Sequence, residues 1–443
     1  MNYIELNNQV IIRDENGKYQ LNKDKEALKS YLEDYIEPKM KKFDNLNDRL
    51  NYLVENDYYS KEILDLYDQY VIDVIYDFIR AKNFKFQSYM SASKFYQNYA
   101  LKSNDGEEIL ENYEDKVLIV ALTLGNGEPK LAKDIAEKLI NQEFQPATPT
   151  FLNAGRARGG KMVSCFLVNV EDSCEGISYA VSSANHLSKI GGGVALNLTR
   201  LRASGESIKG IKGAAGGVMG VAKLLEQSFS YFNQMGARQG AGAVYLNVLH
   251  PDFETLLDSK KINADEKIRL TTLSIGAIIP DKFMELAEKN EKCYAFYPHS
   301  IYQKYGVHLD GIKMDEWYDK LANDDEIEKK EINPRELLTR IAQTQQESGY
   351  PYVVFIDSAN EQHTLKDVGM IKMSNLCCEI FQYQTPSDIK GYGQVSDWGQ
   401  DISCNLGSLN IANVMDNKDI EKTIDVAIRA LTYVSDNTNI EEV

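Results

Sequence analysis

VSCFLVNV, residues 163–170, is the first run of the chain that is dense in the β-branched and aromatic residues typical of a buried strand. Residues 1–145 differ, because their apolar side chains recur at helical spacing. The stretch that joins the two, FQPATPTFLNAG (144–155), is rich in Pro, Thr and Gly turn residues. The change predicts a helical domain over 1–145 and a second domain over 146–443.

The second domain shows a regular alternation of two patterns. Strand-like and helical runs follow one another, as is typical of an α/β domain. The strand-like runs are 163–170, 243–249, 270–279 and 350–356, and the helical runs are 176–189, 218–232, 281–289 and 333–347. The last of these helices has a well-specified start, because Asn333 is followed by Pro334 and, three residues on, by Glu336.

The composition is that of an ordinary globular protein, with 443 residues, 43% hydrophobic and 26% charged. A net charge of -17 argues against a surface that coats nucleic acid, since phosphate backbones need clustered Lys and Arg. No apolar run approaches the roughly 18 residues of a membrane span. The N-terminus, MNYIELNNQV, is too polar for a signal peptide. We therefore expect a cytoplasmic protein without a membrane segment.

The six cysteines are too few for a disulfide scaffold in a chain of this length, and a reducing compartment keeps them as thiols. They lack paired CxxC spacing, and only five histidines accompany them. We therefore expect no metal site. Any disulfide is expected to be transient and to take part in chemistry.

The segment SNLCCEI, residues 374–380, combines an amide, a thiol and a carboxylate. If it is extended, Asn375, Cys377 and Glu379 share one face, while Leu376 and Cys378 point to the other. If it is helical, the three spread over most of a turn. The extended arrangement suits removal of hydrogen from a polyol such as ribose, with the sulfur acting as a radical and the carboxylate as a base. A buried thiol beside a surface Glu is the alternative for this triplet in isolation.

Two further cysteines strengthen the redox interpretation. Cys165 and Cys404 each follow a serine in a strand-like run, so both could project toward one site from neighbouring strands. Reduction of a C–O bond needs two electrons, and a dithiol supplies them by closing to a disulfide if its Cα atoms come within about 7 Å.

Six sequence blocks, in order and spacing, resemble the large catalytic subunit of ribonucleotide reductase. They are TPTFLNAGR (148–156), SCFLV (164–168), SKIGGGVALNLTRLRASG (188–205), QGAGAVYLNVLHPD (239–252), SNLCCEI (374–380) and DISCNLGSLNI (401–411). The similarity extends from about residue 85 to the end of the sequence. It implies the fold of that family, a helical N-terminal domain followed by the first part of a ten-stranded α/β barrel.

The resemblance also implies a role for each matching residue. Cys377 would be the thiyl radical site that abstracts the ribose 3′ hydrogen, Glu379 the base at the 3′ hydroxyl and Asn375 its hydrogen-bonding partner. Cys165 and Cys404 would be the pair that becomes a disulfide in each turnover. The implied substrate-binding residues are Thr150, Ser164, Cys165, Gly193, Asn375, Leu376, Cys377, Cys378 and Glu379.

Regulation by a nucleoside triphosphate is implied as well. Asp172, Arg202 and Lys209 match the specificity-effector site of the family, and basic residues broken by glycines suit a triphosphate. The loops 233–243 and 269–277 resemble those that pass the identity of the effector to the choice of substrate.

The resemblance is to the aerobic, class Ib-like branch, which implies the partners of this chain. It would bind no cofactor of its own and would receive its radical from a small subunit with a dimetal-tyrosyl centre of manganese or iron. A glutaredoxin-like protein would serve as reductant, and two large subunits would form a homodimer. The resemblance implies a ribonucleotide as substrate, in the form of a diphosphate.

The relatives in this family continue for several hundred residues that complete the barrel. We therefore expect a truncated or split chain that needs a complementing C-terminal fragment. An amphipathic run with apolar residues at Ile420, Ile424, Ala427 and Leu431 predicts a helix that would dock on a following segment. The competing hypothesis is a catalytically silent nucleotide-binding or interaction fragment with the same fold.

Overall fold

The computed structural model describes residues 2–232, 239–391, 394 and 396–440 of the chain. It divides into two compact units. The first comprises Met1–Val163 and Asn405–Asn439, and the second Ser164–Cys404 and Ile440–Val443. The domain boundary between residues 145 and 146 stays a prediction.

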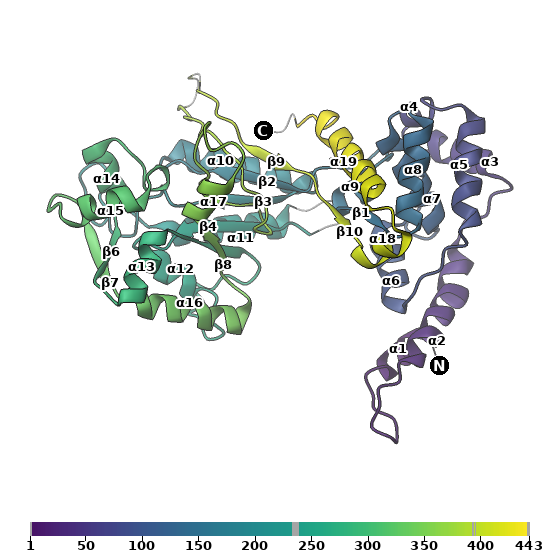
Figure 1. Ribbon diagram of the computed structural model, residues 1–443, viewed down its shortest axis with the longest axis horizontal. Helices are drawn as coiled ribbons and strands as arrows, with labels where there is room; N and C mark the ends of the chain where they lie inside the picture. Colours follow the sequence, from purple (N-terminus) through teal and green to yellow (C-terminus); the bar gives the residue numbers. More distant parts are fainter. Residues whose placement is uncertain (1, 233–238, 392–393, 395, 441–443) are drawn as a thin grey trace. The chain divides into compact units, whose positions relative to one another are not determined.

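The first unit is almost entirely helical (Figure 1, purple to blue, with the yellow C-terminal helices). Its helices are α1 (Tyr3–Gln9), α2 (Asn22–Ser30), α3 (Leu46–Glu55), α4 (Lys61–Leu64), α5 (Gln69–Ala81), α6 (Tyr89–Lys94), α7 (Tyr113–Gly125), α8 (Pro129–Ile140), α9 (Thr148–Asn153), α18 (Ile411–Asn417) and α19 (Ile420–Asp436), with the short turns η1 (Tyr31–Ile36), η2 (Glu37–Lys39) and η3 (Phe95–Tyr99). Two short strands, β1 (Phe144–Pro146) and β10 (Gly407–Leu409), pair antiparallel within this unit.

Helix α7 is the centre of the first unit. Asn112 caps its start by accepting a hydrogen bond from the backbone of Asp115, and nearly all residues of the helix are buried. Helices α5, α8 and α19 pack against it, so that segments far apart in sequence share one core.

The predicted C-terminal helix forms as α19, and two of its four predicted apolar positions, Ile420 and Ile424, stay exposed within this chain. Val426, Ala430 and Val434 are buried. Ile420 and Ile424 remain 47% and 41% exposed. The helix is apolar on two sides, and apolar periodicity alone does not say which side packs against α7 and α8.

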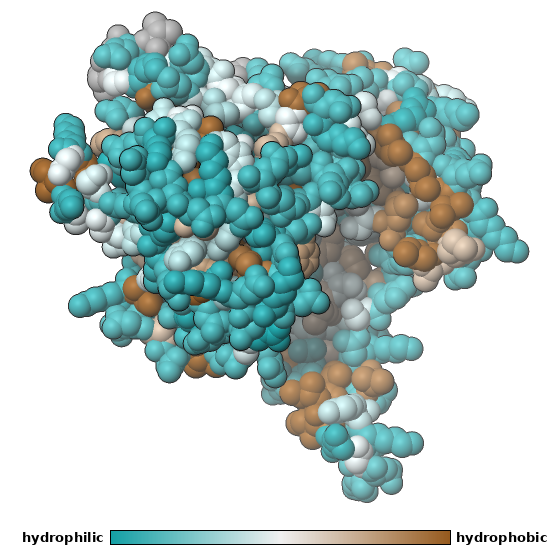
Figure 2. Space-filling view, turned by 60° about the vertical axis from the view of Figure 1, so that its left-hand side comes forward, coloured by the Kyte–Doolittle hydropathy of each residue, from teal (hydrophilic) through white to brown (hydrophobic). Residues whose placement is uncertain are grey.

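Hydrophobic side chains also gather in patches on the molecular surface (Figure 2, brown). Among the exposed ones are Ile411 and Met415 of α18 and Ile428 of α19. Within the part of the chain that the structure describes, no helix combines the length and the apolar character needed to cross a bilayer.

The second unit alternates strands and helices. Its strands are β2 (Cys165–Asn169), β3 (Gly193–Asn197), β4 (Gly242–Asn247), β5 (Ser274–Ile279), β6 (Cys293–Phe296), β7 (Lys329–Ile332), β8 (Tyr352–Phe355) and β9 (Ile402–Cys404). Its helices are α10 (Cys174–Lys189), α11 (Val218–Tyr231), α12 (Phe253–Asp258), α13 (Asp281–Lys289), α14 (Pro298–Tyr305), α15 (Met314–Ala322), α16 (Pro334–Ser348) and α17 (Ile356–Gln362), with the short turn η4 (Leu309–Gly311).

One six-stranded sheet organises the second unit, in the order β8-β5-β4-β3-β2-β9 (Figure 1). The first five of these strands run parallel, as helical crossovers require, and only β9 runs antiparallel to its neighbour β2. Strands β6 and β7 form a separate antiparallel pair. Helix α10 packs against β2 and β3, and α11 packs against β4.

One face of this sheet carries an apolar core. Leu167, Ala195 and Ala243 lie opposite one another on β2, β3 and β4, and all three are fully buried. Met373 and Leu376, from the segment that precedes β9, pack against the same face. We call this the inner face of the sheet, and side chains at every second position of each strand share it.

The strands and helices predicted for this unit are present, but several further elements were not predicted, among them β3, β6 and β7. The Asn333 cap forms as predicted, since its side chain accepts a hydrogen bond from the backbone of Glu336. Strand β3 was not predicted, because glycines 191–193 suggested a turn. All five residues of β3 are buried, and at Gly193 an added Cβ would lie 2.4 Å from the side chain of Leu376.

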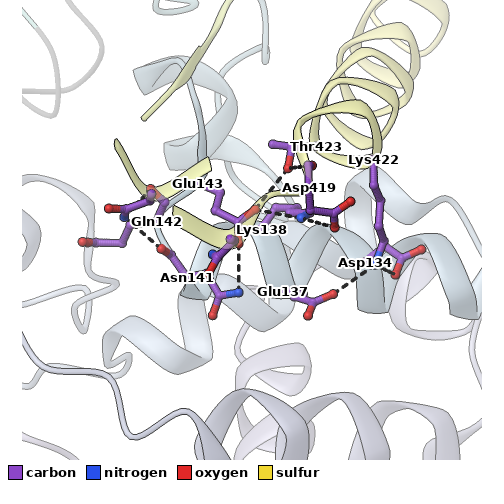
Figure 3. A network of polar contacts seen from close by, with 11 residues as sticks. Asp134, Glu137, Lys138, Asn141, Gln142, Glu143, Asp419, Lys422 and Thr423 are labelled. Carbon is purple, nitrogen blue, oxygen red and sulfur yellow. Dashed lines mark hydrogen bonds and ion pairs between the residues drawn. The ribbon is translucent and has the colours of Figure 1, made fainter. Parts of the chain in front are cut away.

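A buried network of charges ties α18 and α19 to α8 and β1 (Figure 3). Lys138 donates to Glu143 at 2.7 Å and to Asp419 at 3.0 Å. The carboxylate of Glu143 also accepts from Asn417 at 2.7 Å and from Thr423 at 3.1 Å. The side chains of Lys138 and Glu143 are only 2% and 1% exposed, and Glu143 is the fully buried charge partner of Lys138.

We predict that Glu143→Ala lowers the free energy of unfolding of the first unit by about 3–5 kcal/mol, because it leaves the ammonium group of Lys138 buried without its main partner. Hydrogen exchange of the α8 and α19 amides measures the change. The matched control is Lys422→Ala, whose ammonium group pairs with Asp134 and Glu137 but is 40% exposed. That variant is expected to lose at most about 1 kcal/mol. Equal losses in both variants would contradict the prediction.

The contribution of Glu143 also depends on pH. Burial alone would raise its pKa, but hydrogen bonds from Lys138, Asn141 and Asn417 lower it below the ordinary value of 4.5. Because the pKa of Glu143 is lowered in the folded state, its carboxylate contributes its full stabilisation above pH 4.5. This stabilisation is lost as the pH falls through the folded-state pKa.

Candidate active site

Two cysteines face each other across the β2–β9 pair. Cys165 lies directly opposite Cys404 in the antiparallel register, and both side chains are buried. The backbone N–H of Ser164 donates to the carbonyl of Cys404 at 2.8 Å. Residues opposite one another in an antiparallel ladder have Cα atoms about 4.5–5.5 Å apart, within the range of about 4.4–6.8 Å that a disulfide spans. The two sulfurs can therefore join without movement of the strands.

The segment 374–380 contains a turn, so of the two conformations considered for it the extended one does not form. The carbonyl of Asn375 accepts from the N–H of Cys378 at 3.1 Å, which closes the turn. The side-chain oxygen of Asn375 accepts from the N–H groups of Glu379 and Ile380, at 2.9 and 3.0 Å. An asparagine that bonds to its own neighbouring backbone competes with strand pairing, which explains the difference.

The turn nevertheless brings the three polar groups of the segment together. Asn375 is buried, and its amide donates to the carboxylate of Glu379 at 2.8 Å and to the sulfur of Cys165 at 3.5 Å. Cys377 is exposed, and its thiol lies near enough to Cys165 to lower the pKa of that buried thiol. One amide thus links the carboxylate to the buried thiol pair, with the exposed thiol beside them.

Leu376 and Cys378 point the other way from this polar group. Leu376 packs on the inner face against Gly193, and Cys378 packs there as well. The sulfur of Cys378 lies 3.6 Å from the carbonyl of Val353 on β8, as a weak donor. The two residues anchor the turn to the sheet.

The buried thiol of Cys165 is held in its protonated form. The nearby thiol of Cys377 alone would lower the pKa of Cys165, but the neighbouring thiol of Cys404 and burial outweigh that effect and raise the pKa to about 12. None of the six cysteines, all of which lie in the described part of the chain, is in a disulfide.

The remaining residues expected to contact a substrate lie in both units. The hydroxyl of Ser164 is buried and, among the described residues, has no hydrogen-bond partner. Gly193 donates its N–H to the carbonyl of Ser164 at 2.9 Å. Thr150 belongs to the first unit, where its hydroxyl donates to the carbonyl of Met162 at 2.7 Å.

Two of the three expected effector residues, Asp172 and Arg202, line a cavity of about 270 Å³ in the second unit. Arg202 forms an ion pair with Asp172 at 2.6 Å and donates to the carbonyl of Ser207 at 2.9 Å. Lys209 is exposed on the turn that follows, with a left-handed backbone (φ 51°), and it does not line the cavity. Residues 233–238 of the expected relay loop 233–243 lie outside the described residues. The other expected loop, 269–277, runs into strand β5.

Tyr245 is a residue of this site that the sequence did not single out. It lies on β4, is fully buried, and its hydroxyl donates to the carbonyl of Asn375 at 2.6 Å. The only sequence signal was its alternation with Val244 and Leu246 in a strand, which places it on the same face as Ala243. Among the described residues, no group of three His, Cys, Asp or Glu side chains is arranged to hold a metal ion.

Three family models match consecutive parts of the chain. They describe the ribonucleotide reductase N-terminal region over residues 3–84, the ribonucleotide reductase all-alpha domain over residues 85–159 and the ribonucleotide reductase barrel domain over residues 163–442. The predicted fold class, a helical domain followed by part of an α/β barrel, is confirmed.

Curated relatives agree with the family models. The chain is 51% identical to the ribonucleoside-diphosphate reductase subunit alpha of Bacillus subtilis (strain 168), over 99% of this chain and 62% of that protein. It is 44% identical to the protein of the same name from Mycoplasma pneumoniae, over 94% of this chain and 58% of that protein. For Mycoplasma genitalium the identity is 43%, over 99% and 60%.

The chain thus spans about three fifths of the length of these relatives. The barrel-domain model alone covers more than half of the chain, from residue 163 to residue 442. The chain therefore belongs to the ribonucleotide reductase large-subunit family.

Proposed function

We propose that this chain contributes the thiol chemistry of an enzyme that reduces ribonucleotides to 2′-deoxyribonucleotides. The observation that carries the proposal is the convergence of three thiols, an amide and a carboxylate at one place, namely Cys377, Cys165, Cys404, Asn375 and Glu379. The names of the relatives, ribonucleoside-diphosphate reductases, support a nucleoside diphosphate as the substrate class.

The proposed reaction begins at Cys377, the exposed thiol of the group. As a thiyl radical it takes the hydrogen atom from C3′ of the ribose, and Glu379 takes the proton of the 3′ hydroxyl. The amide of Asn375 holds that carboxylate in place at 2.8 Å. The 2′ hydroxyl then leaves as water, with a proton from the thiol pair.

The thiols of Cys165 and Cys404 supply the two electrons. Their S–H bonds break, one S–S bond forms, and the hydrogen atom on Cys377 returns to C3′, which regenerates the thiyl radical. The sum of the steps is one ribonucleotide and one dithiol giving one deoxyribonucleotide, one disulfide and water. The buried hydroxyl of Ser164 and the backbone at Gly193 are beside the thiol pair, where they suit contact with the sugar.

Other proteins complete the proposed cycle. A radical-generating small subunit with a dimetal-tyrosyl centre would create the thiyl radical, and a glutaredoxin-like reductant would reopen the disulfide. The relatives are longer than this chain, which supports a further C-terminal segment as part of the working enzyme. A nucleoside triphosphate at Asp172, Arg202 and Lys209 would regulate it, and two large subunits would associate.

We predict that Cys377→Ser abolishes deoxynucleotide formation, because a serine hydroxyl does not form an alkoxyl radical under the conditions in which a cysteine thiol forms a thiyl radical. The assay combines this chain with a small subunit, a dithiol reductant and a C-terminal fragment that corresponds to the rest of the relatives. The matched control is Cys378→Ser, at the neighbouring thiol that faces the sheet, which is expected to keep most of the activity. Absence of product from the fully complemented wild-type chain would instead favour a catalytically silent nucleotide-binding protein.

A second prediction concerns the thiol pair. Mild oxidation with diamide should join Cys165 to Cys404, because their register already satisfies disulfide geometry. Peptide mass mapping should find this crosslink and its loss of two hydrogens, while Cys293, buried on β6, remains a thiol. In Cys404→Ser the crosslink should disappear. A dominant Cys165–Cys377 disulfide in the wild-type chain would show that the reducing pair is wrongly assigned.

A third prediction concerns the effector cavity. Arg202→Ala should weaken binding of a deoxynucleoside triphosphate by about 10-fold to 100-fold, because a charge-assisted hydrogen bond contributes about 1.5–3 kcal/mol. Lys209→Ala should weaken binding less, since a lysine on an exposed turn is not preorganised. Calorimetric titration measures both, with the exposed Lys313→Ala as control. Unchanged affinity in Arg202→Ala would place the triphosphate elsewhere.

A further inference from the structure

A buried hydroxyl group supports the turn that carries Cys377. Tyr245 stands in the middle of β4 and is fully buried. Its hydroxyl donates to the carbonyl oxygen of Asn375 at 2.6 Å, from the inner face of the sheet. The same oxygen accepts the N–H of Cys378 that closes the turn. Cys377 lies between Asn375 and Cys378 in the chain. The two bonds to the Asn375 carbonyl therefore fix the position of Cys377.

The turn needs such support because its backbone is strained. Cys378 has a φ of 65°, in the left-handed region that residues with a Cβ rarely adopt. No regular strand pairing stabilises residues 374–380, which lie between β8 and β9 in sequence. A strained conformation persists only where its surroundings determine it. Tyr245 donates a hydrogen bond directly from the sheet to the turn backbone.

Gly276 makes room for the ring of Tyr245. It lies directly opposite Tyr245 on the neighbouring strand β5. A Cβ at this position would lie 2.3 Å from a ring carbon of Tyr245, far inside van der Waals contact. Gly276 thus leaves the space that the ring of Tyr245 occupies, and the ring in turn sets the position of the hydroxyl group.

The hydroxyl stays a donor over the working pH range. Burial, followed by the nearby thiol of Cys378, raises the pKa of Tyr245 well above its ordinary value. The carbonyl of Asn375 is consequently faced by a permanent O–H donor.

We infer that Tyr245, seated on Gly276, is a positioning residue that sets the geometry of Cys377 relative to Cys165 and Glu379. The inference rests on the proposed function, because it assigns Tyr245 to the site that would do the chemistry. Tyr245 itself acts only through the Asn375 carbonyl. Small errors of placement at a reacting atom are costly, on the order of 100-fold in rate for about 1 Å.

Tyr245→Phe tests the inference, because it removes the hydroxyl and keeps the ring over Gly276. In the complemented enzyme we expect kcat to fall by about 10-fold or more with KM nearly unchanged, since the substrate-binding groups stay and only the reacting thiol is displaced. Hydrogen exchange of the chain alone should be faster at the amides of Cys378, Glu379 and Ile380. The first donates to the backbone oxygen of Asn375 and the other two to its side-chain oxygen.

The matched control is Tyr318→Phe. Tyr318 is also a buried tyrosine with one backbone partner, the N–H of Tyr294 at 2.9 Å, but it lies on α15. The Tyr318→Phe variant should leave kcat and the hydrogen exchange of residues 378–380 unchanged. Gly276→Ala should reproduce the effect of Tyr245→Phe by displacing the ring, and if that variant fails to fold, Tyr245→Phe alone decides.

The outcomes separate this inference from the proposed function. If the wild-type assembly makes no deoxynucleotide, the proposed function fails, while the exchange experiment still tests the support of the turn. Wild-type kcat together with wild-type exchange in Tyr245→Phe would overturn the inference. A parallel loss of kcat and rise of KM in both tyrosine variants would also overturn it, because that pattern reports general loosening of the fold.

Discussion

The antiparallel pairing of β9 with β2 is the contact on which the candidate site depends. Strands β2, β3, β4, β5 and β8 are parallel and are joined by helical connections, so their order follows from the chain. Strand β9 arrives after a long segment and pairs in the opposite direction. This register places Cys404 opposite Cys165, and a shift by one residue would turn Cys404 to the other face of the sheet. The proposed thiol pair is therefore a property of one strand register.

The turn at 375–378 depends on the same sheet in a different way. Leu376 and Cys378 bury their side chains on the inner face. The side chain of Asn375 makes hydrogen bonds with Glu379, Ile380 and Cys165. Apolar contacts thus hold the segment down, and hydrogen bonds from one asparagine shape it. Tyr245 joins the two, since it belongs to the apolar core and also donates to the turn.

The sequence allowed the architecture to be predicted further than the geometry of the site. Helices and most strands were predictable because their apolar periodicity and caps, such as Asn333, act locally. Strand β3 was missed because the glycines at its start, Gly192 and Gly193, leave room for the side chains of Phe166 and Leu376, which come from elsewhere in the chain. The turn at 375–378 was missed for a related reason, since side-chain hydrogen bonds override the alternation of a strand. The family resemblance indicated which residues belong to the site, but the role of Tyr245 depends on the β4–β5 register, which no local pattern reveals.

The surroundings of the buried thiols bear on the kind of chemistry they suit. Nucleophilic cysteines lie beside cations or helix N-termini, which stabilise the thiolate and lower its pKa. Among the described residues, the polar contacts of Cys165 are the Asn375 amide and the thiols of Cys377 and Cys404. The contact with Cys377 alone would lower its pKa, yet Cys404 and burial raise it to about 12, so the thiol stays neutral at physiological pH. A neutral S–H group can give both its proton and its electrons, whereas a thiolate has already lost the proton. This environment therefore favours reduction by hydrogen transfer over nucleophilic attack, in agreement with the proposed function.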